Sequence, residues 1–220
     1  MSHVYVYALI EGLPSAKASR GKRRIEFLPV SGIYAAIERR ASAPDVNETS
    51  LREQHKTVVE LARLCDPIVP VRFGAWLALD ELTNVIVSRG RVLREAFEFL
   101  RHREQMTVRV FGEPVRSDDE SALEAATGKA YLERLRNAAR PRLTPLAEAV
   151  RRAAGSTAAA ERLESGRGRL QVAIHHLTER GRSREYRALV KRAVETDTTS
   201  DQVVVSGPWP PFAFTPELWP

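Results

Sequence analysis

The sequence predicts an α+β protein of two small domains. Segments with helical spacing alternate with short runs rich in valine and isoleucine, and 43% of the 220 residues are hydrophobic, which is enough for a buried core. The order of elements in the N-terminal block is typical of a ferredoxin-like sheet or a variant of it. The composition changes near residue 115. The C-terminal block is expected to contain a helical hairpin followed by a βαβ unit.

The N-terminal domain is expected to span residues 1–115. Ser50 and Glu53 have the spacing of a capping box, which predicts the start of a helix. Spacings of three and four along this helix place Leu51 and His55 on its apolar face. The expected elements are strands over residues 4–10, 25–30, 33–37, 68–76 and 107–111, and helices from Ser50 to Cys65 and from Asp80 to Leu100. We expect both helices to cover one face of the sheet.

The C-terminal domain is expected to span residues 116–205. A helix is predicted over residues 117–139, and Pro141 ends it. Thr144-Pro145 starts a second helix, which the alanine-rich sequence extends to about residue 160. A strand over residues 170–177, a helix over 183–194 and a strand over 202–205 follow.

Residues 206–220 form a tail rich in proline and aromatic residues. Three prolines within residues 208–211 favour an extended backbone, on which Trp209 and Phe212 are presented with little loss of entropy on docking. The tail either closes the protein's own core or anchors a partner. We expect Trp209 to pack on the C-terminal domain and to position Phe212 and Phe214 beside a partner surface.

The charge and cysteine content limit the classes of function. The net charge of +6 would suit nucleic acid, but the basic residues are interspersed with acidic ones, and the densest run, residues 20–24, is typical of a solvated loop. Cys65 is the only cysteine, so no internal disulfide forms. No apolar run approaches the ~20 residues that span a bilayer, and the N-terminus lacks a signal-peptide pattern. We expect a cytoplasmic protein without membrane contact.

Signatures of catalysis and of metal binding are absent from the sequence. His175 and His176 are adjacent on a strand, so they point to opposite faces. The sequence contains no HExxH motif, nucleophile elbow, Walker loop or GxGxxG motif. The glycines of residues 166–168 follow a predicted helix rather than a strand, which argues against a phosphate cradle. Cys65 is expected to be a buried structural thiol. We expect no enzyme activity, no catalytic residue, no metal and no cofactor.

Arg72 is a charged residue in the apolar stretch of residues 68–74. If it is buried, its guanidinium must pair with a carboxylate such as that of Glu60 or Glu104. If it is not buried, it is available to hold a partner. From composition and position we infer four partner-binding residues, which are Arg72, Phe73, Trp209 and Phe212.

Four stretches of the sequence resemble one protein family. Residues 206–214 are SGPWPPFAF, residues 68–74 are IVPVRFG with His55 upstream, residues 128–132 are GKAYL, and residues 4–10 form the opening strand. In this order, and over nearly the whole chain, they resemble the gas vesicle protein F/L family.

The resemblance implies a cytoplasmic assembly protein that is a minor component of gas vesicles, with two α+β domains and no cofactor. It implies that the partners are the hydrophobic shell protein and other gas vesicle assembly proteins, not nucleic acid or membrane. Two alternatives stay open. A basic, ferredoxin-like nucleic-acid-binding module would alternate aromatic residues with Lys or Arg on one sheet face, whereas these strands contain mainly valine. An enzyme with a dispersed active site is the other.

Overall fold

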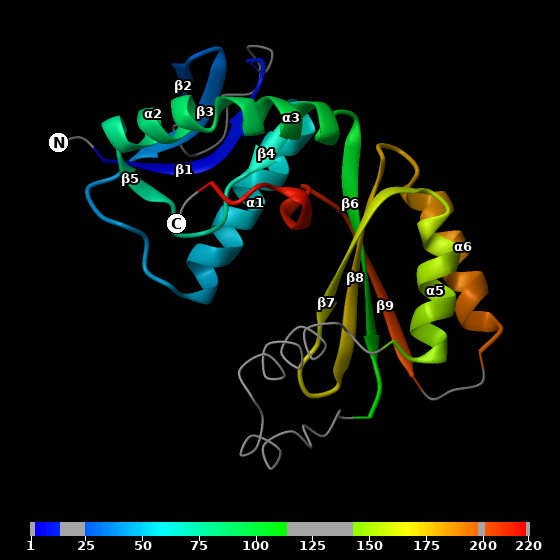
Figure 1. Ribbon diagram of the computed structural model, residues 1–220. Helices are drawn as coiled ribbons and strands as arrows, with labels where there is room; N and C mark the ends of the chain where they lie inside the picture. The colour runs from blue at the N-terminus through cyan, green and yellow to red at the C-terminus, as the bar shows by residue number, and fades with distance from the viewer. Residues whose placement is uncertain (1–2, 14–24, 114–142, 198–200, 219–220) are drawn as a thin grey trace, which may run out of the picture. The chain divides into compact units, whose positions relative to one another are not determined.

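The computed structural model describes residues 3–13, 25–113, 143–197 and 201–218, and the chain divides into two compact units (Figure 1). The first unit is Met1–Glu104 together with Trp209–Pro220, and the second is Gln105–Pro208. The chain therefore enters the second unit inside one strand and leaves it inside another. The sequence predicts domain boundaries after residues 115 and 205. In the structure the chain passes from the first unit to the second after Glu104 and returns after Pro208. The predicted boundaries remain a proposal, which limited proteolysis would test.

The first unit is built on a five-stranded sheet. Its strands are β1 (His3–Ile10), β2 (Glu26–Val30), β3 (Ile33–Arg39), β4 (Ile68–Pro70) and β5 (Trp76–Ala78). The strand order is β2-β3-β1-β4, and β5 pairs with the opposite end of β1 from β4. The neighbouring strands are antiparallel. This is the strand order of a ferredoxin-like sheet.

Three helices cover this sheet, namely α1 (Glu48–Leu64), α2 (Leu79–Ser88) and α3 (Gly90–Leu100). Figure 1 shows α1 on one side of β1, and α2 and α3 on the other. Every residue of β1 from Val4 to Ile10 is buried, as expected for a strand between two layers. The prediction that the helices share one face is wrong. The predicted long second helix is divided at Arg89, whose ψ of 11° departs from helical geometry.

Helix α1 begins earlier than its capping-box pattern predicts. Asn47 is the N-cap, and its Oδ1 accepts a hydrogen bond of 2.9 Å from the backbone N of Ser50. The fully buried side chains of the helix are Gln54, Val58 and Leu61. Together with Cys65 just beyond the helix, the last two pack against the side of the sheet that carries Tyr5, Tyr7, Ala8, Ile10, Ala36 and Ile68.

The tail from Trp209 onward belongs to the first unit, where its described side chains divide between the core and the surface. It contains a short 3-10 helix, η1 (Phe212–Phe214). Phe214 and Leu218 are 7% and 6% exposed. Trp209 and Phe212 are half-buried. One part of the tail therefore closes the core, while the other part leaves aromatic surface accessible.

The second unit is a four-stranded sheet with two helices. Its elements are β6 (Arg103–Phe111), α5 (Pro145–Gly155), β7 (Ala158–Ser165), β8 (Leu170–Glu179), α6 (Ser183–Glu195) and β9 (Gln202–Trp209). The strand order β7-β8-β6-β9 is again ferredoxin-like. Figure 1 shows α5 and α6 side by side on one face of this sheet. Their buried side chains meet Val108 and Ile174 of the strands. The α+β class is confirmed.

Two strands of the second unit differ from prediction. The pattern of residues 107–111 predicts a strand of the N-terminal sheet, but β6 pairs with β8 and β9. Residues 158–165 are strand β7, antiparallel to β8, although alanine there favours a continued helix. The second helix does start at Thr144, whose Oγ1 accepts from the backbone N of Ala147 at 3.2 Å. The helix predicted over residues 117–139, the GKAYL stretch and the basic run at 20–24 lie outside the described residues.

Candidate functional site

The tail crosses α1 and forms a partly exposed aromatic surface there. The ring of Trp209 meets that of His55 edge to face, with centroids 5.1 Å apart. The ring of Phe212 lies nearly parallel to the same imidazole, at 6.1 Å. Between them Pro210 and Pro211 are buried, so the backbone that carries both rings is fixed against the unit. Trp209 belongs to the first unit by its contacts, so the prediction that it packs on the second is wrong.

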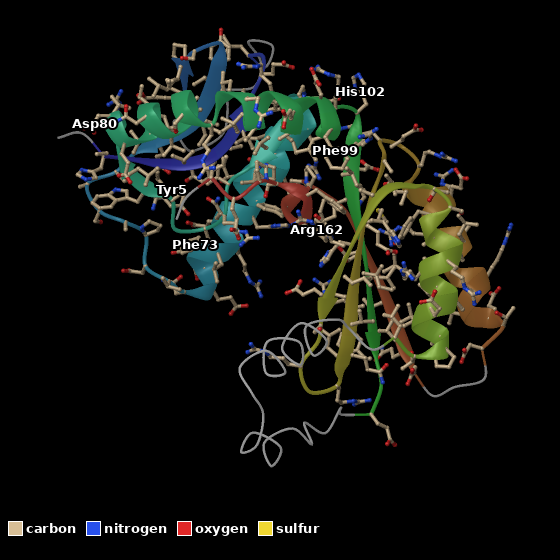
Figure 2. All side chains as sticks on the ribbon, in the orientation of Figure 1. Tyr5, Phe73, Asp80, Phe99, His102 and Arg162 are labelled. Carbon is tan, nitrogen blue, oxygen red and sulfur yellow. The ribbon has the colours of Figure 1, made fainter. Side chains whose placement is uncertain are left out.

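Phe73 lies in the turn between β4 and β5. Its ring lies 6.2 Å from that of Tyr5 (Figure 2). The turn requires Gly74, which has a φ of +98°, and the backbone N of Gly74 donates to Tyr5 Oη at 3.3 Å. Phe73 and Phe212 pack against the same cluster of buried residues. Phe73 and Phe212, predicted from distant parts of the sequence, therefore pack on the same core cluster, while Trp209 is linked to Phe212 through the imidazole of His55.

Arg72 is exposed, which excludes the predicted buried pair with Glu60 or Glu104. The strand expected over residues 68–76 is interrupted after Pro70, and Arg72 falls in the connection before the turn. The alternation that places Arg72 on an inner face therefore does not apply.

Two residues of α1 that the pattern places in the core are at the surface instead. Leu51 is 45% exposed, and His55, one turn later, is also exposed. The stripe that is buried begins at Gln54 rather than at His55. The spacing of Gln54, Val58 and Leu61 would have identified it, but a glutamine is an unusual core residue. Leu51, His55, Arg72, Phe73, Trp209 and Phe212 are all exposed or half-buried in the first unit, and we refer to this set of residues as the tail patch.

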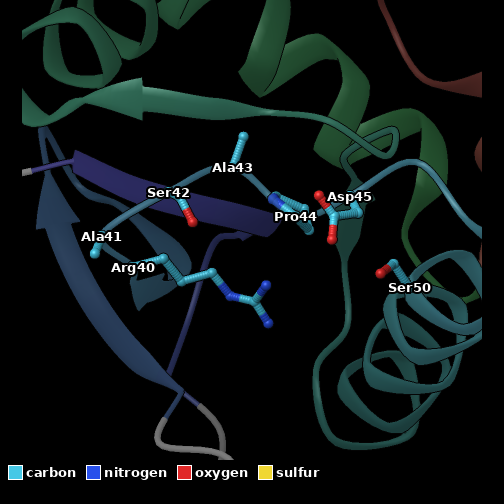
Figure 3. Close-up of a pocket in the computed structure, with 7 residues that line it drawn as sticks. All are labelled: Arg40, Ala41, Ser42, Ala43, Pro44, Asp45 and Ser50. Carbon is cyan, nitrogen blue, oxygen red and sulfur yellow. The ribbon is translucent and has the colours of Figure 1, made fainter.

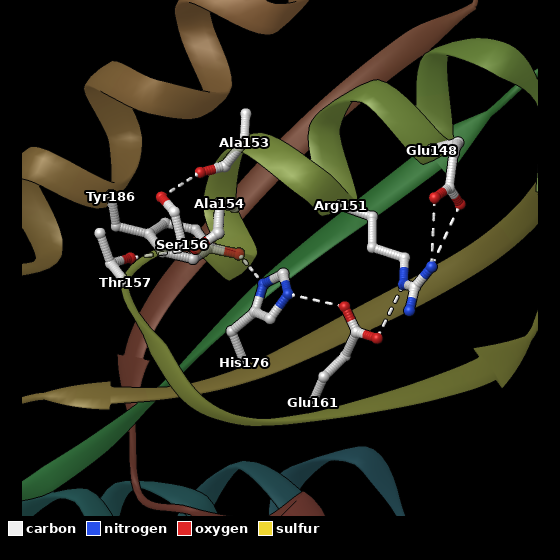
Figure 4. A network of polar contacts seen from close by, with 9 residues as sticks. All are labelled: Glu148, Arg151, Ala153, Ala154, Ser156, Thr157, Glu161, His176 and Tyr186. Carbon is white, nitrogen blue, oxygen red and sulfur yellow. Dashed lines mark hydrogen bonds and ion pairs between the residues drawn. The ribbon is translucent and has the colours of Figure 1, made fainter.

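A second candidate site is a polar network inside the second unit (Figure 4). The His176 side chain is fully buried, and its Nδ1 lies 2.7 Å from Tyr186 Oη, while its Nε2 lies 3.0 Å from Glu161 Oε2. Glu161 Oε1 accepts a hydrogen bond of 2.7 Å from Arg151 Nε. Arg151 Nη1 also donates to Glu148 at 3.2 Å. The network joins β8, α6, β7 and α5.

Burial determines where the protons of this network lie. Desolvation, with the nearby charge of Glu161, raises the pKa of Tyr186, so this hydroxyl keeps its proton and donates to His176 Nδ1. The neutral imidazole then donates from Nε2 to Glu161. Desolvation lowers the pKa of His176, although the hydrogen bond to Glu161 opposes it. Neither Tyr186 nor His176 has exposed surface, so this hydrogen bond fastens α6 to β8 in the interior of the unit.

His175 is on the opposite sheet face, as predicted. Its Nδ1 lies 3.1 Å from Thr107 Oγ1 and its Nε2 lies 3.3 Å from Glu164 Oε2. The glycines of residues 166–168 follow strand β7, not a helix, and form the turn of the β7–β8 hairpin. No helix N-terminus follows them, so the phosphate-binding arrangement is absent at this turn. Cys65 is buried in the first unit, as expected for a structural thiol.

The described part of the chain has neither a cluster of metal ligands nor a helix that could span a membrane. Within residues 3–13, 25–113, 143–197 and 201–218, no three His, Cys, Asp or Glu side chains gather as a metal ion would require. None of the helices placed there combines the length and apolar character needed to cross a membrane.

Comparisons with known proteins agree on one family. The family described as Gas vesicle synthesis protein GvpL/GvpF matches residues 3–216. The fold is similar to that of gas vesicle protein GvpF from Anabaena sp. PCC7120, with a TM-score of 0.77, 12% identity, and coverage of 98% of this chain and 97% of that one. GvpF from Microcystis aeruginosa gives a TM-score of 0.74, 13% identity, and coverage of 97% and 99%. A search of curated protein sequences found no match. Because the family match extends over nearly the whole sequence, the chain belongs to the GvpL/GvpF family of gas vesicle synthesis proteins.

Proposed function

We propose that this protein binds the hydrophobic gas vesicle shell protein through the tail patch and supports vesicle formation as an assembly protein and minor vesicle component. The observation that carries the proposal is the division of the tail into a buried half and an accessible half. Phe214 and Leu218 hold the tail in the core, so Trp209 and Phe212 stay at the surface in a fixed position. Rings held in this way lose little conformational entropy on binding.

The composition of the patch suits an apolar partner. Aromatic residues and arginine are enriched at the energetic centres of protein interfaces. Leu51 and the two tail rings supply apolar area, and exposed Arg72 supplies one charge at the margin. A shell protein that exposes apolar segments before assembly needs such a surface to prevent its aggregation.

We further propose a cytoplasmic, non-enzymatic protein without a cofactor, whose partners include other gas vesicle assembly proteins. We propose no role for nucleic acid or membrane. The rings that we propose for partner binding are those of Phe73 and the tail, whereas a ferredoxin-like nucleic-acid-binding module uses rings alternating with Lys or Arg on its sheet strands.

The test compares Trp209→Ala and Phe212→Ala with Phe99→Ala in vesicle-forming cells. Phe99 is a suitable control because it is 40% exposed, belongs to the same unit, and is on α3 rather than in the tail. We expect both tail variants to lose co-purification of the shell protein and to form few vesicles, while Phe99→Ala behaves as wild type. Melting temperatures are measured in parallel. Normal vesicles and normal shell-protein capture in both tail variants would refute the proposal.

If Trp209→Ala is destabilised, loss of vesicles could result from unfolding, so one further experiment is needed. If Trp209→Ala melts early, a remote stabilising substitution is added. Vesicle formation that returns with stability would show that the tail only closes the core, and that the shell protein binds elsewhere.

A further inference from the structure

Strand β9 lies at one edge of the sheet in the second unit (Figure 1). It is the last strand in the order β7-β8-β6-β9, so in the described part of the chain no strand pairs with its outer side. Val203 and Val205 pack against the core on the helix side, while Val204 is on the other face and is 40% exposed. An edge of this kind offers N–H and C=O groups to which another extended chain can pair.

The other sheet edges in the described part of the chain carry features that oppose strand addition. Strand β2 contains Pro29, and β4 and β5 have three residues each. Strand β7 carries the charged residues Glu161, Arg162 and Glu164. Proline, short length and charge are the usual means by which proteins protect an edge. From Gln202 to Gly207, β9 contains neither proline nor charge, so its edge is the one best suited to accept a strand.

Arg187 of α6 shows which backbone groups of β9 face outward. Its Nη1 donates to the carbonyl oxygen of Val205 at 3.3 Å, and its Nη2 donates to that of Gly207. Since a strand has a period of two residues, the N–H and C=O of Val203 face the same outer side. Arg187 therefore covers the Gly207 end of the edge, and the Val203 end lies beyond these two bonds.

A row of basic side chains follows this edge along α6. Arg184, Arg187 and Lys191 are exposed and have the three- and four-residue spacing of one helix face. We call these three residues the basic ridge. Lys191 lies 3.6 Å from the carboxylate of Glu195, so Arg184 and Arg187 provide most of the charge of the ridge. The ridge would attract an acidic partner to the edge of β9.

The first unit has an open cavity of about 400 Å³ beside the first turn of α1 (Figure 3). Arg40 and Asp45 contribute opposite charges to its wall. The cavity therefore does not favour a ligand of one sign. The basic ridge has a single sign of charge and lies beside unpaired backbone, so it defines its partner more closely.

We propose that the outer edge of β9 binds an extended, acidic segment of a partner protein as an additional strand. The backbone of the segment pairs with Val203 and Val205. Its acidic side chains lie on the α6 side, against the basic ridge, and its alternate, apolar side chains lie beside Val204. Pairing at Val205 releases an N–H group of Arg187, which then donates to a carboxylate of the segment.

A second copy of this chain is a poorer occupant. Antiparallel pairing of two β9 strands would place the two α6 helices on the same side of the joined sheet, with their basic ridges close together. Like charges in this position oppose association. The site contains no residue of the tail patch, so its loss would leave binding of the shell protein unaffected.

The test titrates the full-length protein into a labelled peptide that alternates valine with glutamate and has blocked ends, and follows fluorescence anisotropy. One comparison peptide has lysine in place of glutamate. The other has a methyl group on every peptide nitrogen and cannot pair as a strand. We expect saturable binding of the glutamate peptide that weakens as salt is added, and no saturable binding of the lysine peptide. The N-methylated peptide should bind at least about tenfold more weakly.

Variants test the same edge and the same ridge. Val203→Pro removes one outward N–H group, and Arg184→Glu reverses one charge of the ridge. Each should weaken binding of the glutamate peptide by about tenfold. Arg152→Glu is the matched control, because Arg152 is exposed on α5, which contacts β7 and β8. It should bind the peptide as wild type does.

Melting temperatures are measured for all variants. If Val203→Pro does not fold, Arg184→Glu and the N-methylated peptide still decide. Equal binding of the glutamate and N-methylated peptides would show attraction of charge without strand pairing. Self-association that Arg184→Glu strengthens would show that a second copy occupies the edge. Either result, or no saturable binding of the glutamate peptide, would overturn the proposal.

Discussion

The ring of Trp209 lies edge to face against that of His55, with centroids 5.1 Å apart. The contact ties the tail to the exposed side of α1, at a residue whose spacing predicts a buried position. Its consequence is that the accessible half of the tail has a defined location, although the strand that leads into it belongs to the second unit.

The contact between His55 and Trp209 should make the effects of their two substitutions on the free energy of unfolding non-additive. We expect a double-mutant cycle of His55→Ala and Trp209→Ala to give a coupling free energy of ~0.5–1.5 kcal/mol, the range for edge-to-face aromatic pairs. Urea unfolding measures it. The same cycle with Phe99→Ala in place of Trp209→Ala should be additive, and coupling of equal size there would mean that the effect is not local.

Phe214→Ala should destabilise the protein much more than Phe212→Ala. Phe214 is 7% exposed, and truncation of a buried phenylalanine costs ~3–5 kcal/mol. Phe212 already has contact with solvent, so its truncation should cost less free energy of unfolding. Equal losses for the two variants would show that the tail is not divided between core and surface.

Arg72→Ala should change the free energy of unfolding by less than about 1 kcal/mol. Arg72 is exposed, and substitutions at such positions seldom do more. Thermal or urea unfolding measures the change. A loss of ~3–5 kcal/mol, typical of a broken buried ion pair, would instead restore the buried pairing with Glu60 or Glu104.

The stability of the second unit should fall as the pH is lowered below about 6.5, the ordinary pKa of histidine. Burial lowers the pKa values of His175 and His176, so the unfolded chain binds more protons than the folded chain between the folded-state pKa values and 6.5. Unfolding therefore becomes more favourable as the pH falls through that window, and this contribution to stability is fully present above it.

Urea unfolding at a series of pH values measures the dependence. His176→Gln keeps a polar side chain but cannot titrate, so its stability should depend less on pH than that of wild type. An unchanged slope in His176→Gln would show that His176 is not responsible.

Gly207→Ala should destabilise β9. Gly207 has a φ of +114°, and an added Cβ would lie 2.7 Å from the carbonyl oxygen of Gln105. Strained backbone of this kind costs ~1–3 kcal/mol. Gly155→Ala is the matched control, because the nearest atom to its added Cβ is at 3.8 Å and its φ is not positive. The control should be neutral or slightly stabilising, and equal behaviour of both variants would contradict the structure.

The sequence predicts the class of the fold better than the pairing of its strands. The alternation of residues 107–111 identifies a strand, but nothing in it indicates whether that strand joins the first or the second sheet. The alanines of β7 carry no strong preference for a strand, and the hairpin with β8 decides its conformation. In both cases the structure depends on pairing with strands that are distant in the sequence, and local propensity does not predict that pairing.

Local sequence patterns also fail to predict which residues of the candidate site are exposed. Proline and aromatic composition identify the tail, yet Phe212 and Phe214, two residues apart, differ in burial. That difference depends on how η1 lies on α1. His55 and Arg72 were assigned from ideal periodicity. In the structure α1 turns Gln54, Val58 and Leu61 towards the core, and β4 ends at Pro70, so His55 and Arg72 are both exposed.

Because Trp209–Pro220 belongs to the first unit, the two segments of that unit are synthesised at different times. The second unit is an insertion between two segments of the first, so a ribosome completes all of Gln105–Pro208 before it makes the residues that close the first unit's core. Domains generally fold as units while the chain emerges. The nascent first unit therefore waits, without Phe214 and Leu218 in place, until the inserted unit has been translated. On the proposed function, binding of the shell protein therefore cannot begin before Trp209 and Phe212 have been made, after the whole of the inserted unit.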